Sequence, residues 1–344
     1  MKHVAPFTGL VDLLAGNLGG QALGATDDFF AGCQSLVNPE PATFVPGKFT
    51  ERGKWMDGWE SRRRRGPGYD TCILKLGARG RVFGLDIDTS HFNGNQPAFA
   101  SVDALLAPPN ATYAALLEAP WACILEPTRT HPDCHNLFAA LGSGASASHL
   151  RLNIFPDGGV ARLRAYGVVD VQLAERDCDG EQQSHISPGC VDLAALKSGG
   201  LVLACSDAHF GSEQQLLLPG RSPNMGGGWE TRRRRGAGHD WVVVRLAAAA
   251  QLEVLEVDTQ HFKGNFPDSC SIEGIHAPGA PITSLLAQDA WAPLLAQTKL
   301  LADTRHFFPL SPAPDAGLNK PVTHLRLNTF PDGGISRLRA WGRP

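Results

Sequence analysis

The chain has 344 residues, enough for two domains of ordinary size that each bury a hydrophobic core. Its hydrophobic fraction of 43% and charged fraction of 19% are typical of a folded soluble protein. No apolar stretch reaches the length of a membrane helix. A formal net charge of −3 excludes a general electrostatic attraction to nucleic acid or to anionic membranes.

The N-terminus and the cysteines both favour a cytoplasmic protein. The first residues lack the apolar run and small-residue cleavage site of a signal peptide. The eight cysteines form no Cys-x-x-Cys pair, and their positions do not correspond between the two halves of the chain. We therefore predict free thiols instead of a disulfide framework.

Four blocks of the sequence occur twice, in the same order. The offset between matching residues is 180 for the first block, 170 for the next two and 175 for the last, which places insertions or deletions in the loops between them. Chance is a poor explanation for four collinear matches, so we predict a tandem duplication of one domain. The matching blocks are residues 11–13 with 191–193, 58–66 with 228–236, 88–95 with 258–265, and 149–159 with 324–334.

The repeats are predicted at residues 1–172 and 173–344. They are joined near residues 170–190, where Glu175, Asp177 and neighbouring polar residues indicate a linker.

Each copy is predicted to be built from short β-strands. In chain order, strand-like runs occur at residues 72–76 and 82–88, and a helical pattern at 112–118. Residues 149–155 and 160–166 alternate apolar and polar side chains on either side of Pro-Asp-Gly-Gly, which predicts a β-hairpin. The second copy repeats these signals at residues 241–246, 252–258 and 324–341, with a helical pattern at 284–298 broken by Pro293.

This pattern predicts an all-β fold, with two tandem antiparallel sandwiches of the jelly-roll type and a few helices at the rim. A doubly wound α/β fold is disfavoured because no strand, glycine loop and helix follow one another. The glycine motifs that bind nucleotide phosphates are also absent from the sequence.

An arginine run follows Gly-Trp-Glu in both copies. If the first run is extended, Glu60, Arg62 and Arg64 share one face while Arg63 and Arg65 share the other. One pair could bind a carboxylate while the others pair with nearby acids. The candidates are Glu60 and Glu230 for catalysis, and Arg62, Arg63, Arg232 and Arg233 for substrate binding.

A second motif, Asp-Thr-x-His-Phe-x-Gly-Asn, follows a predicted strand in each copy. Asp88 and His91 lie in one tight loop and are candidates for general acid–base catalysis, and the amide of Asn95 can bind a ureido or amide group. The alternative is an Asx-type turn with a hydrogen-bonded histidine. The counterparts in the second copy are Asp258, His261 and Asn265.

Other polar motifs are weaker candidates. His149 and Arg151, like His324 and Arg326, are interpreted mainly as residues on the face of a sheet. The sequence His131-x-x-Cys134-His135 occurs once and lacks a second pair of ligands, so it is interpreted as a loop. No cofactor motif is evident, and a divalent metal held by Asp and His residues that the fold assembles stays an open alternative.

Three compound motifs resemble those of the allantoicase family, also called allantoate amidinohydrolases, over nearly the full length of the chain. The resemblance implies two galactose-binding-like jelly-roll repeats and a homo-oligomer. It also implies hydrolysis of a carbon–nitrogen bond in a linear amidine, converting allantoate to ureidoglycolate and urea in purine and allantoin degradation. The motifs are residues 54–65, 86–95 and 149–159.

Two rival functions follow from the same residues. A non-catalytic jelly-roll module could bind a small anionic or sugar ligand, since a fold alone does not define a function. A nucleic-acid-binding protein could use the arginine runs, although the acids beside them oppose this. The expected partner is a small molecule, with no nucleic acid and no membrane.

The copies also differ. Asp57 has no acidic counterpart, Tyr69 matches His239, and Asp86 matches Glu256. The sequence therefore leaves open whether one repeat or both carry a site.

Overall fold

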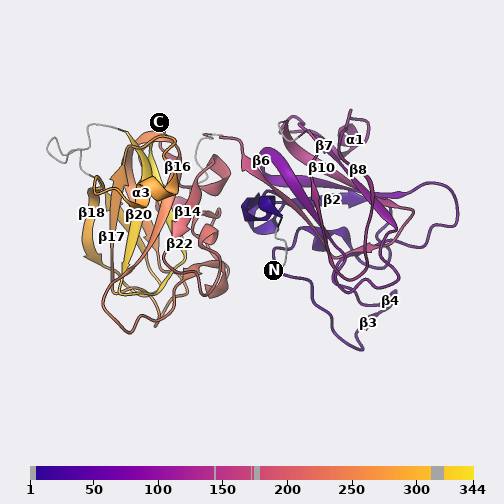
Figure 1. The fold of residues 1–344 in the computed structure, drawn as a ribbon, viewed down its shortest axis with the longest axis horizontal. Helices are drawn as coiled ribbons and strands as arrows, with labels where there is room; N and C mark the ends of the chain where they lie inside the picture. The colour runs from indigo at the N-terminus through magenta and orange to yellow at the C-terminus, as the bar shows by residue number, and fades with distance from the viewer. Residues whose placement is uncertain (1–4, 143–144, 172, 174–178, 311–320) are drawn as a thin grey trace. The chain divides into compact units, whose positions relative to one another are not determined.

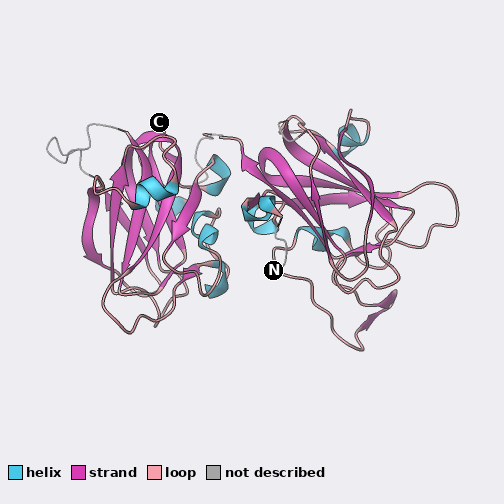
Figure 2. Ribbon diagram, viewed as in Figure 1, coloured by secondary structure: helices cyan, strands magenta, loops and turns pink. Residues whose placement is uncertain are grey.

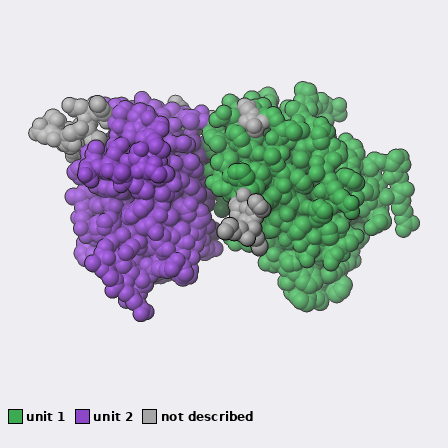
Figure 3. All heavy atoms as spheres, in the orientation of Figure 1, with its two compact units in different colours: residues 1–170 green, residues 171–344 purple. Residues whose placement is uncertain are grey.

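The structure, a computed structural model, describes residues 5–142, 145–171, 173, 179–310 and 321–344. It contains two compact units, residues 1–170 and 171–344 (Figure 3). Strands make up most of each unit, and the helices are short (Figure 2). Of the predicted linker, residues 172 and 174–178 lie outside the described residues, and helix α2 (Gly180–Gln183) begins just after them.

Unit 1 is a sandwich of two β-layers that share one long strand. The first half of β6 (Asp70–Asp88) pairs with β10 (Ser146–Phe155), and its second half pairs with β12 (Arg162–Val169). Leu152 of β10 and Leu163 of β12 belong to one buried hydrophobic cluster, so the layers face each other across a common core. The predicted runs at 72–76 and 82–88 are thus parts of one strand.

The other elements of unit 1 complete these layers and the loops at their ends (Figure 1). They are β1 (Val11–Asp12), β2 (Gln21–Ala25), β3 (Phe49–Thr50), β4 (Gly53–Lys54), β5 (Trp59–Glu60), β7 (Phe99–Leu105), α1 (Tyr113–Leu117), β8 (Ala122–Arg129), β9 (His135–Ala139) and β11 (Gly159–Val160).

Unit 2 repeats the same topology, with β16 as the long shared strand. Its elements are β13 (Val191–Asp192), β14 (Leu201–Cys205), β15 (Trp229–Glu230), β16 (Asp240–Asp258), β17 (Ser269–Ile275), α3 (Ile282–Leu286), β18 (Ala292–Lys299), β19 (Arg305–Pro309), β20 (Val322–Phe330), β21 (Gly334–Ile335) and β22 (Arg337–Arg343). The prediction of two tandem all-β sandwiches with a few peripheral helices is confirmed.

The predicted hairpin at residues 149–166 is wrong, as is its copy at 324–341. In unit 1, β10 lies between β6 and β7, whereas β12 lies between β6 and β1. Residues 156–159 carry the chain from one layer to the other, and β11 pairs with β5 on the way. Alternation of apolar residues shows which face of a strand is buried, but it does not identify the neighbouring strand.

The helical prediction at residues 284–298 is also wrong over its second part. Helix α3 ends at Leu286, and residues 292–299 form β18, which pairs with β17. Pro293 has no backbone N–H group, which the interior of a helix would need as a donor. A strand at the edge of a sheet tolerates this loss, so Pro293 is compatible with β18.

Charge pairing inside unit 1 explains why Asp57 has no acidic counterpart in unit 2. The side chain of Arg162 is 1% exposed, and its Nη2 lies 2.8 Å from Asp57 Oδ2. The equivalent Arg337 donates instead to the carbonyl oxygens of Gly220 and Gly227. Burial and the neighbouring Arg339 lower the pKa of Arg337 to about 10. Asp57 is therefore a structural counter-ion.

Replacing Asp57 with Ala leaves the buried guanidinium of Arg162 without its counter-charge. We expect a loss of about 3 kcal/mol in the free energy of unfolding, measured by urea denaturation. The control is Asp268→Ala, which removes a pair with Lys299 whose side chains are 56% and 77% exposed and should change stability by less than about 0.5 kcal/mol. Equal denaturation midpoints for D57A and the wild type would contradict this role.

Candidate active site

A small cavity of about 230 Å³ opens among the loops of unit 1. This volume is below the roughly 300–1,000 Å³ of sites for drug-sized ligands, so the cavity suits a smaller molecule. The compound motifs at residues 54–65 and 86–95 and the β3–β4 hairpin all contribute to its wall. The lining residues are Phe30, Gly53, Lys54, Met56, Glu60, His91, Asn93 and Asn95.

Packing around Phe92 brings the signature motifs together. Its ring is fully buried against Gly159 and Gly58, where an added Cβ would lie 2.0 and 2.8 Å from ring carbons. The amide of Gly159 also donates to the carbonyl oxygen of Asn95 at 2.7 Å, and Gly159 pairs with Glu60 in the β5–β11 ladder. Positions 58 and 159 therefore require glycine, because a larger side chain at either one would overlap the Phe92 ring.

Glu60 and Asn95 are in direct contact within the cavity. Asn95 Nδ2 donates to Glu60 Oε1 at 2.8 Å. Burial raises the pKa of Glu60 above its usual value, against the opposing effects of the Asn95 hydrogen bond and the positive charge of Lys54. A carboxyl group shifted in this direction is suited to exchange protons nearer neutral pH.

His91 also lines the cavity, in a backbone conformation that its loop stabilises. Its φ of 70° lies in the left-handed region, and its amide donates to Asp133 Oδ1 at 2.7 Å. Its Nε2 lies 3.2 Å from the carbonyl oxygen of Ala42. Because a carbonyl only accepts, Nε2 is the donor in this contact, and in the neutral ring Nδ1 is then the acceptor.

Asp88 does not line the cavity. It is 3% exposed, and its Oδ1 accepts from the amide of Ser90 at 2.8 Å, as in the Asx-type turn considered as the alternative. Beside it, Asp86 Oδ2 lies 2.7 Å from His135 Nδ1. Burial raises the pKa of Asp86 to about 6, with His135 opposing the shift. Asp88 is thus buried outside the cavity that His91 lines.

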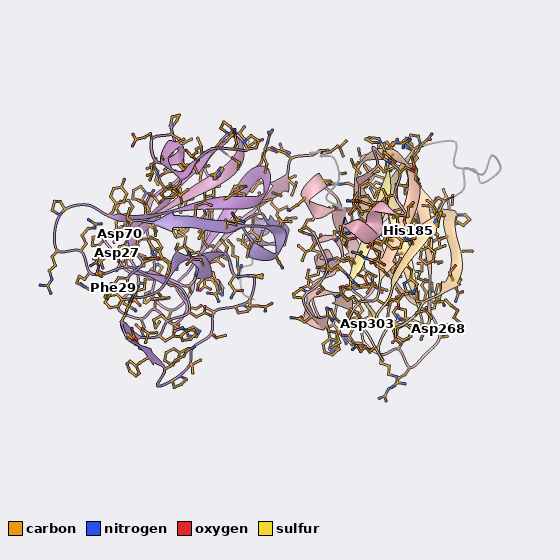
Figure 4. The ribbon with its side chains drawn as sticks, turned by 180° about the vertical axis from the view of Figure 1, so that it is seen from behind. Asp27, Phe29, Asp70, His185, Asp268 and Asp303 are labelled. Carbon is orange, nitrogen blue, oxygen red and sulfur yellow. The ribbon has the colours of Figure 1, made fainter. Side chains whose placement is uncertain are left out.

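The arginine run lies outside the cavity, and two of its four side chains pair with acids. Arg62 Nε is 2.7 Å from Asp27 Oδ2, and Arg64 contacts Asp70. Asp27, Phe29 and Asp70 gather on the same part of unit 1 (Figure 4), and the guanidinium of Arg62 lies 5.2 Å from the Phe29 ring. These ion pairs give Arg62 and Arg64 a structural role in unit 1.

The remaining arginines extend into solvent. Arg63 and Arg65 are exposed, and within the described ranges they pair with no acid. In unit 2, Arg232 approaches Asp207 at 3.5 Å, and Arg233 is exposed. The candidate substrate-binding residues Arg62, Arg63, Arg232 and Arg233 are thus not brought together with Glu60 and His91.

Unit 2 preserves the contacts of the site and adds a methionine beside them. Asn265 Nδ2 donates to Glu230 Oε1 at 2.6 Å, and His261 Nε2 lies 2.9 Å from the carbonyl oxygen of Ser222. Met225 Sδ lies 3.4 Å from Asn265 Nδ2, where unit 1 has an open cavity. Asp258 is fully buried and accepts from the amide of Gln260.

The β3–β4 hairpin provides the side chains that sequence motifs alone did not identify. The offset between the repeats falls from 180 to 170 across this region, so unit 2 is ten residues shorter here. The hairpin extends from unit 1 (Figure 1) and supplies Lys54 to the cavity, where the matched residue of unit 2 is Asn224. The change in offset was the signal that could have pointed to Lys54.

Other candidate sites are not supported by geometry. Among the residues that the structure describes, no group of three or more His, Cys, Asp or Glu side chains is arranged to hold a metal ion. The predicted loop at His131 and Cys134 supports the site loop, because both carbonyl oxygens accept from Thr89 Oγ1. Six of the described cysteines, Cys33, Cys72, Cys123, Cys134, Cys205 and Cys270, are free thiols. No helix in the described ranges is long and apolar enough to cross a membrane.

The jelly-roll fold and the small polar cavity define a protein that binds or converts a small charged molecule. A family model described as an allantoicase repeat matches residues 11–170 and 191–344. The chain belongs to the allantoicase family, whose members hydrolyse a carbon–nitrogen bond in the linear amidine allantoate. It is therefore a hydrolase of this class.

Relatives match the chain over almost its whole length. A probable allantoicase of Burkholderia mallei is 47% identical over 333 residues, which are 96% of this chain and 94% of the relative. A probable allantoicase of Ralstonia nicotianae is 47% identical over 326 residues, 94% of this chain and 92% of the relative. The crystal structure of allantoicase from Saccharomyces cerevisiae superposes with a TM-score of 0.78 at 32% identity, covering 97% of this chain and 93% of that one.

Replacing Asn95 with Ala removes the hydrogen bond that favours the charged form of Glu60. We expect the pKa of Glu60 to rise further, measured by carboxyl ¹³C NMR titration with the signal assigned through Glu60→Gln. Asn265→Ala is the matched control in unit 2 and should leave the Glu60 titration unchanged. An unchanged or lower pKa in N95A would show that the Asn95 hydrogen bond does not stabilise the charged form of Glu60.

Proposed function

We propose that the cavity of unit 1 is the single site in each chain at which allantoate is hydrolysed. The observation that carries the proposal is the convergence of Glu60, His91, Asn95 and Lys54 on one small cavity. Unit 2 retains Glu230, Asn265 and His261 but has no lysine at the position of Lys54, and Met225 lies over its asparagine.

Recognition of the substrate follows from the charges of the wall. Allantoate has one carboxylate and two ureido groups on its central carbon. The ammonium group of Lys54 supplies the opposite charge for the carboxylate, and it lies 4.5 Å from the Phe44 ring, which limits its movement. The amides of Asn93 and Asn95 both donate and accept, so they complement ureido N–H and C=O groups.

Proton transfer is assigned to Glu60. Its carboxylate removes a proton from water as the water oxygen forms a bond to the central carbon. The bond from that carbon to one ureido nitrogen breaks, and Glu60 passes the proton to this nitrogen, which leaves in urea. His91 Nδ1 accepts a hydrogen bond from the water and orients it.

This reaction exchanges a carbon–nitrogen bond for a carbon–oxygen bond with water alone. It needs no redox or group-transfer cofactor, and in the proposal the side chains of the cavity carry the proton. We further propose that the chain acts as a cytoplasmic homo-oligomer. The family resemblance supports the oligomer, and the six free cysteines named above support a reducing compartment.

Replacing Glu60 with Gln keeps the size of the side chain but removes the proton carrier. We expect kcat to fall by roughly 10²–10⁴, measured by urea release from allantoate, while the thermal midpoint of unfolding stays near that of the wild type. The matched variant Glu230→Gln should alter kcat by less than about threefold. Comparable losses in the two variants would contradict a single site in unit 1.

Replacing Lys54 with Met removes the proposed partner of the substrate carboxylate. We expect KM to rise about tenfold, equivalent to roughly 1.4 kcal/mol, with a smaller change in kcat. Lys48→Met is a control on the same hairpin, because Lys48 lies over Trp55 and does not line the cavity. A fall in kcat without a change in KM would assign Lys54 to the chemical step instead.

A further inference from the structure

A larger groove of about 700 Å³ lies on unit 2, separate from the residues matched to the catalytic cavity. Its floor is the face of β16, β17 and β20 that points away from the core. Trp241, Glu273 and Arg326 line the groove, whereas their chain neighbours Val242, Ile272 and Leu327 are fully buried. This alternation is the period-2 pattern of a strand with one face in the core.

Polar groups on this floor are joined by hydrogen bonds, and some of their donor and acceptor atoms have no partner within the described part of the chain. Arg326 Nε donates to Glu273 Oε2 at 2.7 Å, and Asn328 Nδ2 donates to the same oxygen at 3.0 Å. Within the described part of the chain, the terminal nitrogens of Arg326 donate no hydrogen bond and Glu273 Oε1 accepts none. The groove therefore presents hydrogen-bond donors beside an acceptor.

The opposite charges of Glu273 and Arg326 balance each other on the floor. Burial of Glu273 opposes its ionisation, but its hydrogen bonds to Arg326 and Asn328 outweigh this effect and hold its pKa below the usual value. The carboxylate thus neutralises the guanidinium. A balanced pair of this kind favours an uncharged polar group over a free anion.

The walls of the groove add flat and apolar surfaces. The Trp291 ring lies 4.8 Å from the Arg326 guanidinium and stabilises it from one side. Trp241, Leu295 and Phe330 line the groove around the polar floor. Leu285 of helix α3 belongs to one buried cluster with Val243 of β16 and Ile275 of β17, and the neighbouring Leu286 lines the groove. These walls suit a planar apolar group attached to the polar one.

Unit 1 has related residues at the matched positions, but its acid is more enclosed. Arg151 lies 2.9 Å from Asp103 and 5.1 Å from the Trp121 ring. The side chain of Asp103 is 13% exposed, against 25% for Glu273, which is one methylene longer. The longer acid brings the acceptor of unit 2 closer to solvent.

We propose that the groove of unit 2 binds a small uncharged molecule in which a ureido or carboxamide group is attached to a planar apolar group. The ureido carbonyl accepts from the terminal nitrogens of Arg326, and a ureido N–H donates to Glu273 Oε1. The planar group lies against Trp241 and Phe330. This site does not depend on the catalytic roles assigned in unit 1.

Calorimetric titration of the full chain with phenylurea tests the proposal. The protein should carry Glu60→Gln and Lys54→Met, so that the catalytic cavity does not contribute to binding. We expect saturable binding that Arg326→Gln weakens at least tenfold. Arg151→Gln is the matched control in unit 1 and should leave the affinity within twofold.

A second variant covers the case in which R326Q does not fold. Leu295→Trp lies on the edge strand β18 and fills the groove without altering its ion pair, so it should also abolish binding. Galactose and benzoate, a neutral sugar and an anion, should not bind. The proposal is overturned if phenylurea fails to bind, if R326Q and L295W both bind it normally, or if benzoate binds equally well.

Discussion

The site of unit 1 depends on the close packing of one aromatic ring against two glycines. Phe92 fills the space that side chains at Gly58 and Gly159 would occupy, and it thereby fixes the distance between the histidine loop and β5. Glu60 and Asn95 come within hydrogen-bond distance because this contact holds their backbones together. Close-packed interiors transmit such constraints because they contain few voids. Phe262 repeats the arrangement against Gly228 and Gly334, so the frame of the site is a property of both repeats.

The repeats differ in the segment that lies beside this packing of phenylalanine against glycine. In unit 1 the longer segment forms the β3–β4 hairpin and contributes a cation, whereas in unit 2 a short turn around Met225 takes its place. A duplicated framework with unequal loops is a common basis for new function, because loops tolerate change at little cost to the core. In the proposed mechanism, one copy supplies the reaction while the other retains the frame and opens a different groove on its sheet.

Sequence patterns predicted the duplication and the all-β class and supplied Glu60, His91 and Asn95 as candidate site residues, because each rests on local spacing or on matched motifs. The strand partners were not predictable in the same way. β10 and β12 have ideal hairpin spacing, yet each pairs with β6. These pairings depend on the packing of whole layers and not on local spacing. The acidic partners of the arginines were not predictable either, because Arg62 and Asp27 lie 35 residues apart and no local pattern links them. Lys54 was missed because its hairpin occurs in only one repeat.

The long shared strand has a consequence for folding. Since β6 belongs to both layers of unit 1, neither layer has a complete set of strands without the other. Its partners β10 and β12 arrive from more than 60 residues downstream, so each repeat must close large loops before its sheets are complete. Such topologies fold slowly and as a whole. The duplication therefore doubled a unit that is cooperative in itself, and the second copy could diverge without leaving the first one incomplete.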